Sequence, residues 1–131
     1  MYDKSLTIRV TPTDKTPLLE FLPRDMIFNM IGVSIPDDAK TFYTPILEWI
    51  EEFTNENIEE PIVINIDLDY FSIQSASILL KMIKIFSVLP KVTVNWFYDD
   101  PDTEEIGRDL AYMVTITFNF INKNNRIWYN S

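Results

Sequence analysis

The chain of 131 residues carries a net charge of −9 and contains neither cysteine nor histidine. Phosphate backbones and anionic membranes repel a chain this acidic, so we expect no binding to nucleic acid or membrane. The missing residue types exclude disulfides, thiol nucleophiles, imidazole bases and cysteine-ligated zinc, which weighs against an enzyme and against a bound cofactor. Apolar residues make up 47% of the chain, which predicts one folded domain over residues 1–131.

The amino-terminal residues MYDKSLTIRV show no signal-peptide pattern. No apolar run approaches the roughly 18 residues that a membrane-spanning helix needs. We therefore expect a cytoplasmic protein.

The first half of the chain predicts three strands and a helix. Residues 6–10 alternate between apolar and polar, as a strand does, and residues 11–17 form a loop with two prolines. Residues 18–22 and 26–31 predict a β-hairpin, which Gly32 ends where the backbone needs space or a positive φ. A helix is predicted over residues 39–55, and Pro45 either kinks it or restarts it with Thr44 as N-cap.

The second half alternates strands and helices. We predict strands over residues 62–68, 92–98 and 115–121, helices over 75–88 and 104–112, an acidic loop over 99–105, and a polar tail over 122–131. The fold class is therefore α/β, or mixed α+β, with its core over residues 6–121. The mixed sheet has an antiparallel hairpin part at its N-terminal side and a βαβαβ part at its C-terminal side, with helices packed on it.

A hydroxyl-rich turn follows the central strand. Ser72, Ser75 and Ser77 lie where the strand over residues 62–68 leads into the next helix. Free N–H groups and the helix dipole favour a phosphate at a helix N-terminus, so Ser72 and Ser75 are candidate phosphorylation sites, with Ser75 slightly favoured. The alternative is that one of them only caps the helix, a role worth about 1 kcal/mol.

The helix over residues 75–88 is more apolar than one buried face requires. One apolar stripe suits the core, and Ile78, Met82 and Ile85 belong to a second stripe beside it. This second stripe predicts an exposed surface next to the turn on which a partner docks. The alternative is that neighbouring elements bury both stripes.

Acidic residues follow two strands that we expect to be parallel. Asp67 and Asp69 close one strand, and Asp99 and Asp102 follow the next. If the strands are neighbours, these carboxylates share one sheet edge and are weak candidates for Mg²⁺ ligands. The alternative is a solvated acidic rim. No lysine is placed to complete a receiver-like phosphoacceptor site, because Lys81 and Lys84 lie farther along a helix.

Several aromatic residues call for separate interpretation. Trp96 and its two neighbours, Phe97 and Tyr98, are expected to pack in the core and at its rim. Tyr43, Trp49 and Trp128 are candidates for an interface.

The ordered residues of several short blocks resemble a known family. The blocks are Gly32-x-Ser34-x-Pro36-Asp37, Phe42-Tyr43-x-Pro45, Trp49, Tyr70-Phe71-x-x-x-Ser75 and Trp96-x-Tyr98-Asp99-x-x-Asp102-x-x-Glu105-x-Gly107. Together they resemble the SiaC-type regulatory proteins of bacteria over residues 6–121. The resemblance implies a fold similar to STAS domains and anti-sigma-factor antagonists.

The resemblance also implies a partner-switching function. In the family, a cognate kinase phosphorylates a hydroxyl in the turn after the central strand and a PP2C-type phosphatase removes the phosphate. The unphosphorylated form activates a diguanylate cyclase, which links the family to biofilm control. With the second apolar stripe of the helix, we expect the partner-binding residues to be Tyr70, Phe71, Ile73, Gln74, Ile78, Met82 and Ile85.

The turn departs from the family pattern. The family usually has Asn-Thr-Ser-Ser after the aromatic pair, with the threonine as phosphoacceptor, whereas this chain has Ser72, Ile73, Gln74 and Ser75. Isoleucine cannot be phosphorylated. Either Ser72 or Ser75 has taken the role, or the protein is a constitutive binder.

Two other functional classes stay open on the sequence. One is a Mg²⁺-dependent phosphoryl enzyme or receiver that uses the acidic residues above. The other is a small-ligand sensor, because some STAS-like folds bind nucleotides, although the chain has no glycine-rich phosphate loop.

Overall fold

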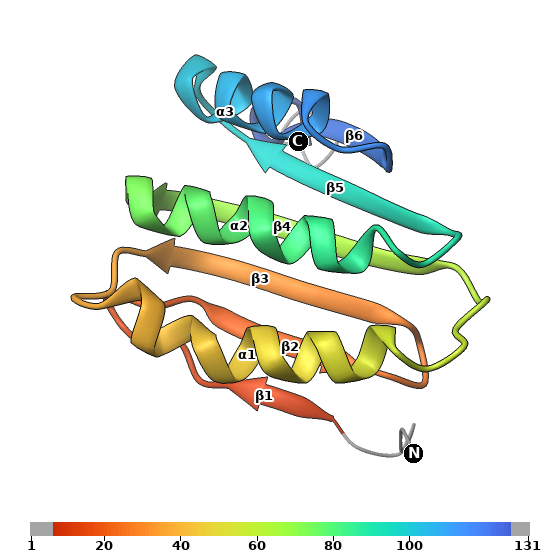
Figure 1. The fold of residues 1–131 in the computed structure, drawn as a ribbon. Helices are drawn as coiled ribbons and strands as arrows, with labels where there is room; N and C mark the ends of the chain where they lie inside the picture. Colours follow the sequence, from red (N-terminus) through yellow and green to blue (C-terminus); the bar gives the residue numbers. More distant parts are fainter. Residues whose placement is uncertain (1–6, 127–131) are drawn as a thin grey trace.

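The computed structural model describes residues 7–126 as one six-stranded sheet with helices packed on it (Figure 1). The chain order is β-β-β-α-β-α-β-α-β, as predicted, followed by a short helix α4. The strands are β1 (Ile8–Val10), β2 (Leu18–Leu22), β3 (Ile27–Ser34), β4 (Ile62–Phe71), β5 (Val92–Tyr98) and β6 (Thr117–Asn122). The helices are α1 (Ala39–Thr54), α2 (Ile73–Phe86), α3 (Pro101–Tyr112) and α4 (Lys123–Arg126).

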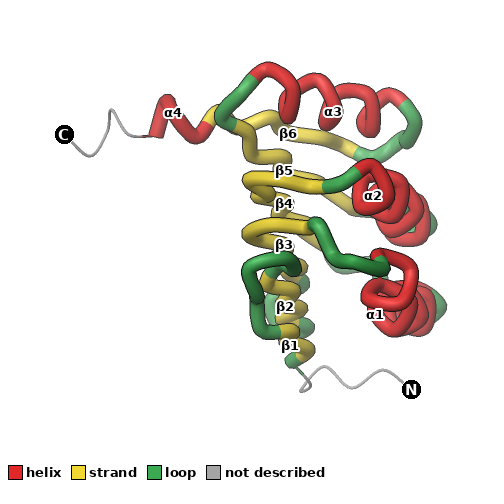
Figure 2. Tube along the Cα trace, turned by 90° about the vertical axis from the view of Figure 1, so that its left-hand side faces the viewer, coloured by secondary structure: helices red, strands yellow, loops and turns green. Residues whose placement is uncertain are grey.

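The strands lie in the sheet in the order in which they occur in the chain. β1, β2 and β3 are antiparallel, and β3, β4, β5 and β6 are parallel. Right-handed crossovers that always step to the next strand place their helices on one face. Figure 2 shows α1, α2 and α3 on that face, while the opposite face carries no described helix along the strands. The predicted mixed sheet is confirmed.

The core lies between the sheet and the helices. Alternation in β4 buries Ile62, Ile64 and Ile66 on the helix side. Aromatic rings of β2, α1 and α2 close this layer, and the rings of Phe21 and Phe53 meet edge to face with centroids 4.7 Å apart. Edge-to-face pairs add to the stabilisation that burial gives.

Helix α1 is continuous through Pro45. Its N-cap is Asp38, whose side chain accepts a hydrogen bond from the Thr41 N–H. The alternative that Thr44 restarts the helix is therefore wrong. Thr44 instead donates its hydroxyl to the Lys40 carbonyl.

Gly32 has a φ of +124°, as predicted, and the hairpin pairing of β2 with β3 ends directly before it at Leu18 and Ile31, although β3 itself continues to Ser34. The pairing of β3 with β4 shifts register between Gly32 and Val33. A residue with a Cβ rarely adopts this backbone, so glycine permits the bulge. Beyond the bulge, Ser34 faces the core beneath the turn that follows β4.

A row of asparagines crosses the helix-free face of the sheet. Asn119 donates to Asn95, Asn95 to Asn65, and Asn65 to Asn29, with nitrogen–oxygen distances of 2.9–3.1 Å. Asn29 donates in turn to Glu20. This asparagine ladder joins five neighbouring strands through side chains as well as through the backbone.

Within residues 7–126, no helix combines the length and the apolar character that crossing a bilayer requires. The predicted polar tail over residues 122–131 begins with the last residue of β6 and continues as α4, and its residues beyond 126, with Trp128, lie outside the described part of the chain.

Candidate functional site

Ser72 joins the end of β4 to the start of α2. It has an extended backbone and is the N-cap of α2, because its Oγ accepts the Ser75 N–H at 3.1 Å. Its own N–H donates to the Ser34 carbonyl at 2.9 Å, which holds the turn against the end of β3. α2 thus begins two residues earlier than predicted, and β4 extends to Phe71.

Ser75 lies in the core. Its side chain is 0% exposed, and its Oγ accepts hydrogen bonds from Ser34 Oγ at 2.8 Å and Ser72 Oγ at 3.1 Å. Ser34 Oγ also shares a hydrogen bond with the hydroxyl of Tyr43, which is itself fully buried. The slight preference for Ser75 as phosphoacceptor is not supported, because a kinase has no access to a buried hydroxyl.

The hydroxyl of Tyr43 belongs to the same buried hydrogen-bond network as Ser34 and Ser75. Burial raises the pKa of the Tyr43 hydroxyl to about 12, although its hydrogen bond to Ser34 acts in the opposite direction. The prediction that Tyr43 lines an interface is wrong, since its side chain faces Ser34 and not solvent. Trp49 is partly buried and stacks on Phe53.

The residues beside Ser72 are exposed. Tyr70 is 71% exposed and Ile73 is 87% exposed. Gln74 is also exposed, whereas Phe71 is partly buried and meets Trp96 edge to face. The structure thus groups Ser72 with an exposed apolar surface.

The second apolar stripe of α2 is only partly available. Met82 is fully buried, so the prediction that it contributes to an exposed surface is wrong. It faces the core, and the helices and sheet cover it. Ile78 and Ile85 are partly buried.

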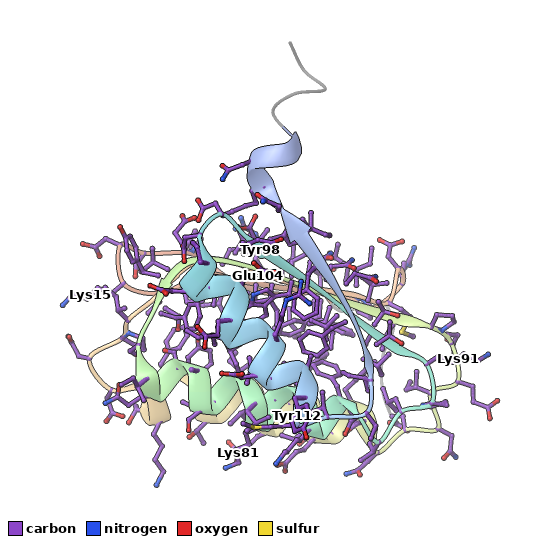
Figure 3. All side chains as sticks on the ribbon, turned by 90° about the horizontal axis from the view of Figure 1, so that it is seen from above. Lys15, Lys81, Lys91, Tyr98, Glu104 and Tyr112 are labelled. Atoms are coloured by element: carbon purple, nitrogen blue, oxygen red, sulfur yellow. The ribbon has the colours of Figure 1, made fainter. Side chains whose placement is uncertain are left out.

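A groove of about 730 Å³ lies between α1 and α2, which pack side by side (Figure 1). Ile73, Ile78 and Leu47 supply apolar lining, and the first of these follows Ser72 directly. Lys40 and Lys81 line it from opposite helices. Figure 3 shows Lys81 projecting from α2 on the side away from the sheet.

The acidic residues do not form a metal site. β4 and β5 are parallel neighbours, as the metal hypothesis required, but residues 7–126 contain no group of three or more acidic side chains able to hold an ion. Lys123 Nζ lies 2.8 Å from Asp67 and 3.1 Å from Asp69. A lysine ammonium thus already occupies the position between these two carboxylates.

Lys123 is a residue that the sequence analysis missed. Partial burial alone would lower the pKa of Lys123, but hydrogen bonds and charges from Asp67 and Asp69 outweigh burial and raise it. Lys123 follows β6, far along the chain from β4, and only the order of strands brings it to these aspartates. The expectation that no lysine is placed at these aspartates to complete a receiver-like site considered Lys81 and Lys84 alone and is therefore wrong.

The other two candidate ligands lie around the start of α3. Asp99 follows β5, and Asp102 lies in the first turn of α3, which begins at Pro101 and not at residue 104. Asp100 caps this helix, and the Thr103 N–H that it accepts holds the pKa of the Asp100 carboxyl below its usual value. Much of the predicted acidic loop is thus a capped helix start.

The sequence matches the model of the SiaC family regulatory phosphoproteins over residues 10–123, and the chain belongs to this family. Its structure is similar to apo-SiaC from Pseudomonas aeruginosa, with a TM-score of 0.77 and 18% identity over 88% of this chain and 98% of that one. It is also similar to the structure of the diguanylate cyclase SiaD in complex with its activator SiaC, from the same organism. That match has a TM-score of 0.79 and 16% identity over the same shares of the two chains. A comparison with curated protein sequences found no significant match.

Proposed function

We propose that this protein is a non-enzymatic, cytoplasmic partner-switching regulator that is controlled by phosphorylation of Ser72. The supporting observation is the contrast between the two serines of the turn. Ser72 caps α2 beside exposed Tyr70 and Ile73, whereas Ser75 is fully buried. Ser72 thus takes the role that Ile73, at the family acceptor position, cannot perform.

A phosphate on Ser72 suits the local structure. It adds a charge approaching −2 at a helix N-terminus, where the dipole and unpaired N–H groups stabilise an anion. The same charge lies next to the exposed side chain of Ile73. An apolar partner surface would have to bury that charge, so phosphorylation acts as an off switch for binding.

The proposed partners follow from family membership. SiaC of Pseudomonas aeruginosa is the activator of the diguanylate cyclase SiaD. We extend this to a diguanylate cyclase-like effector for the unphosphorylated form, with a cognate kinase and a PP2C-type phosphatase acting on Ser72 and a role in biofilm control. The proposed contact residues are Tyr70, Phe71, Ile73, Gln74, Ile78 and Ile85. A Mg²⁺-dependent phosphoryl enzyme or receiver using Asp67 and Asp69 is not favoured, because the described residues 7–126 hold no group of three acidic side chains able to bind the ion.

The test compares Ser72→Ala and Ser72→Asp as baits in cytoplasmic extract from the native cell. We expect the alanine variant to retain a partner that the aspartate variant loses. Thr117→Asp is the control, because it places the same charge at an exposed hydroxyl on β6, away from the turn. Equal retention of the partner by both Ser72 variants, or phosphate found only at other residues by mass spectrometry, would contradict the proposal.

A further inference from the structure

The groove between α1 and α2 combines an apolar lining with two lysines. Leu47 and Ile78 are partly buried within it, and Ile73 is exposed beside Ser72. Its lining residues on α1 run from Ala39 to Leu47, which corresponds to about 12 Å of helix. A groove of this length between two packed helices suits two turns of a third helix.

Two lysines and two aspartates line the groove. Lys40 and Lys81 are exposed and form no ion pair within the described part of the chain. Hydrogen bonds from Thr41 and, to a smaller extent, the nearby charge of Lys40 lower the pKa of the Asp38 carboxyl, so Asp38 stays an anion beside Lys40. Asp37 lies 3.1 Å from Lys15 Nζ, and Asp38 accepts the Thr41 N–H and hydroxyl.

Two unpaired lysines beside an apolar lining stand out in a chain whose net charge is −9. An apolar ligand alone would leave both ammonium groups at the rim of the contact without partners. A ligand with carboxylates on either side of its apolar stripe would pair with both lysines, and charge complementarity of this kind steers association.

We propose that the groove between α1 and α2 binds an acidic amphipathic helix of the partner protein, with Leu47, Ile73 and Ile78 contacting its apolar stripe and Lys40 and Lys81 its carboxylates. This inference rests on the proposed function and specifies the chemistry of the partner. It also explains why a phosphate would be effective at Ser72. The dianion would stand at the end of the groove and repel the acidic helix as well as oppose apolar contact.

The test selects ligands from a phage library of randomised helices against the unphosphorylated wild-type protein. We expect enriched helices to carry Asp and Glu beside an apolar stripe with i, i+3, i+4, i+7 spacing. Synthetic copies of the enriched helices are then measured by fluorescence polarisation. Their affinity should fall about tenfold or more with Lys40→Glu/Lys81→Glu and should weaken as salt is raised.

Lys91→Glu is the matched control, because Lys91 is also an exposed lysine and Figure 3 shows it at the opposite end of the molecule from Lys15. It should leave the affinity within about twofold of wild type. The groove proposal is overturned by no enrichment, by enriched helices without excess acidic residues, or by an equal effect of Lys91→Glu.

The two proposals fail separately. Helices that bind the groove while Ser72→Asp leaves a cellular partner bound would contradict only the phosphorylation switch. A partner lost with Ser72→Asp but unaffected by Lys40→Glu/Lys81→Glu would contradict only the groove.

Discussion

Ser72 and Ser75 are one helical turn apart and have opposite surroundings. The first is a partly buried N-cap, and the second is fully buried and accepts hydrogen bonds from Ser34 and Ser72. A negative charge at the two positions should therefore have very different effects on folding.

Ser72→Asp should change the free energy of unfolding by less than about 0.5 kcal/mol, because aspartate is a good N-cap. Ser75→Asp should lose about 3 kcal/mol or more, because it buries a carboxylate without a cationic partner. Urea unfolding of both variants measures the difference. Equal stability of the two would mean that Ser75 is more accessible than its hydrogen bonds indicate.

Tyr43 predicts a loss of stability at alkaline pH. Its folded-state pKa of about 12 lies above the ordinary value of 10.0. The resulting stabilisation is complete below about pH 10 and disappears as pH rises toward 12, and two pKa units correspond to at most about 3 kcal/mol.

Tyr43→Phe cannot ionise, so its stability should decline less than that of wild type over this range. The urea midpoints of both proteins are measured at pH steps from about 9 to 12. Their difference separates the effect of Tyr43 ionisation on stability from the effect of the lysines that titrate in the same range. Parallel curves would contradict the shift.

For single residues, the sequence predicted the roles that depend on residues close by in the chain. The turn and its helix were visible in the local pattern, and so was capping by a serine. Burial of Ser75 was not, because its hydrogen-bond partner Ser34, which also bonds to Tyr43, lies 41 residues earlier in the chain. The Asp67–Lys123 pair was missed for the same reason.

Among the elements, α3 depends on a close approach to β5. The Trp96 indole N–H donates to the Thr103 carbonyl at 3.0 Å, and Gly107 faces the same ring. A Cβ at Gly107 would lie 2.5 Å from Cδ1 and 2.6 Å from Cε2 of Trp96. Glycine in the middle of this helix is therefore explained by packing.

Gly107→Ala should destabilise the protein by about 1–3 kcal/mol through overpacking, even though alanine favours a helix by about 1 kcal/mol. Trp96 is 1% exposed and fixed by its hydrogen bond, so it has little freedom to move. Urea unfolding followed by tryptophan fluorescence measures the change. Asp109→Ala, at an exposed position of α3, should be neutral or slightly stabilising, and a similar gain at Gly107 would contradict the packing argument.

The start of α3 was missed although its signals are local. Asp100 as N-cap and Pro101 in the first turn are typical of a helix start. The dense acidic residues led instead to the interpretation as a loop. In a first turn, however, Asp102 and Glu104 are favoured by the helix dipole.

In the whole molecule, the strand order explains why the three long helices lie on one face of the sheet, which hydrophobic alternation alone does not predict. The apolar pattern predicted a strand over residues 62–68, which corresponds to most of β4. It did not predict that all three long helices would share one face, because that follows from each crossover stepping to the next strand in sequence.

Net charge affects the stability of the molecule as a whole. At −9, repulsion among like charges opposes the compact state, while ion pairs with exposed partners, such as Lys15–Asp37, contribute little. We expect the thermal midpoint to rise by a few degrees between about 10 and 150 mM NaCl, because salt screens the repulsion. Differential scanning fluorimetry measures this, with sucrose of equal osmolarity as control. A falling midpoint would show that ion pairs dominate.

The asparagine ladder removes an ambiguity that hydrophobic alternation leaves. A strand whose register shifts by one residue exposes its apolar side chains to solvent. A shift of two residues keeps the same side chains facing the core. Burial therefore barely distinguishes the native register from registers shifted by an even number of residues. If β4 slipped by two residues, Asn65 would lose both Asn29 and Asn95, and Val63 or Asp67 would stand between their amides. The core therefore rejects alignments shifted by an odd number of residues, and the asparagine ladder selects the native alignment among those shifted by an even number.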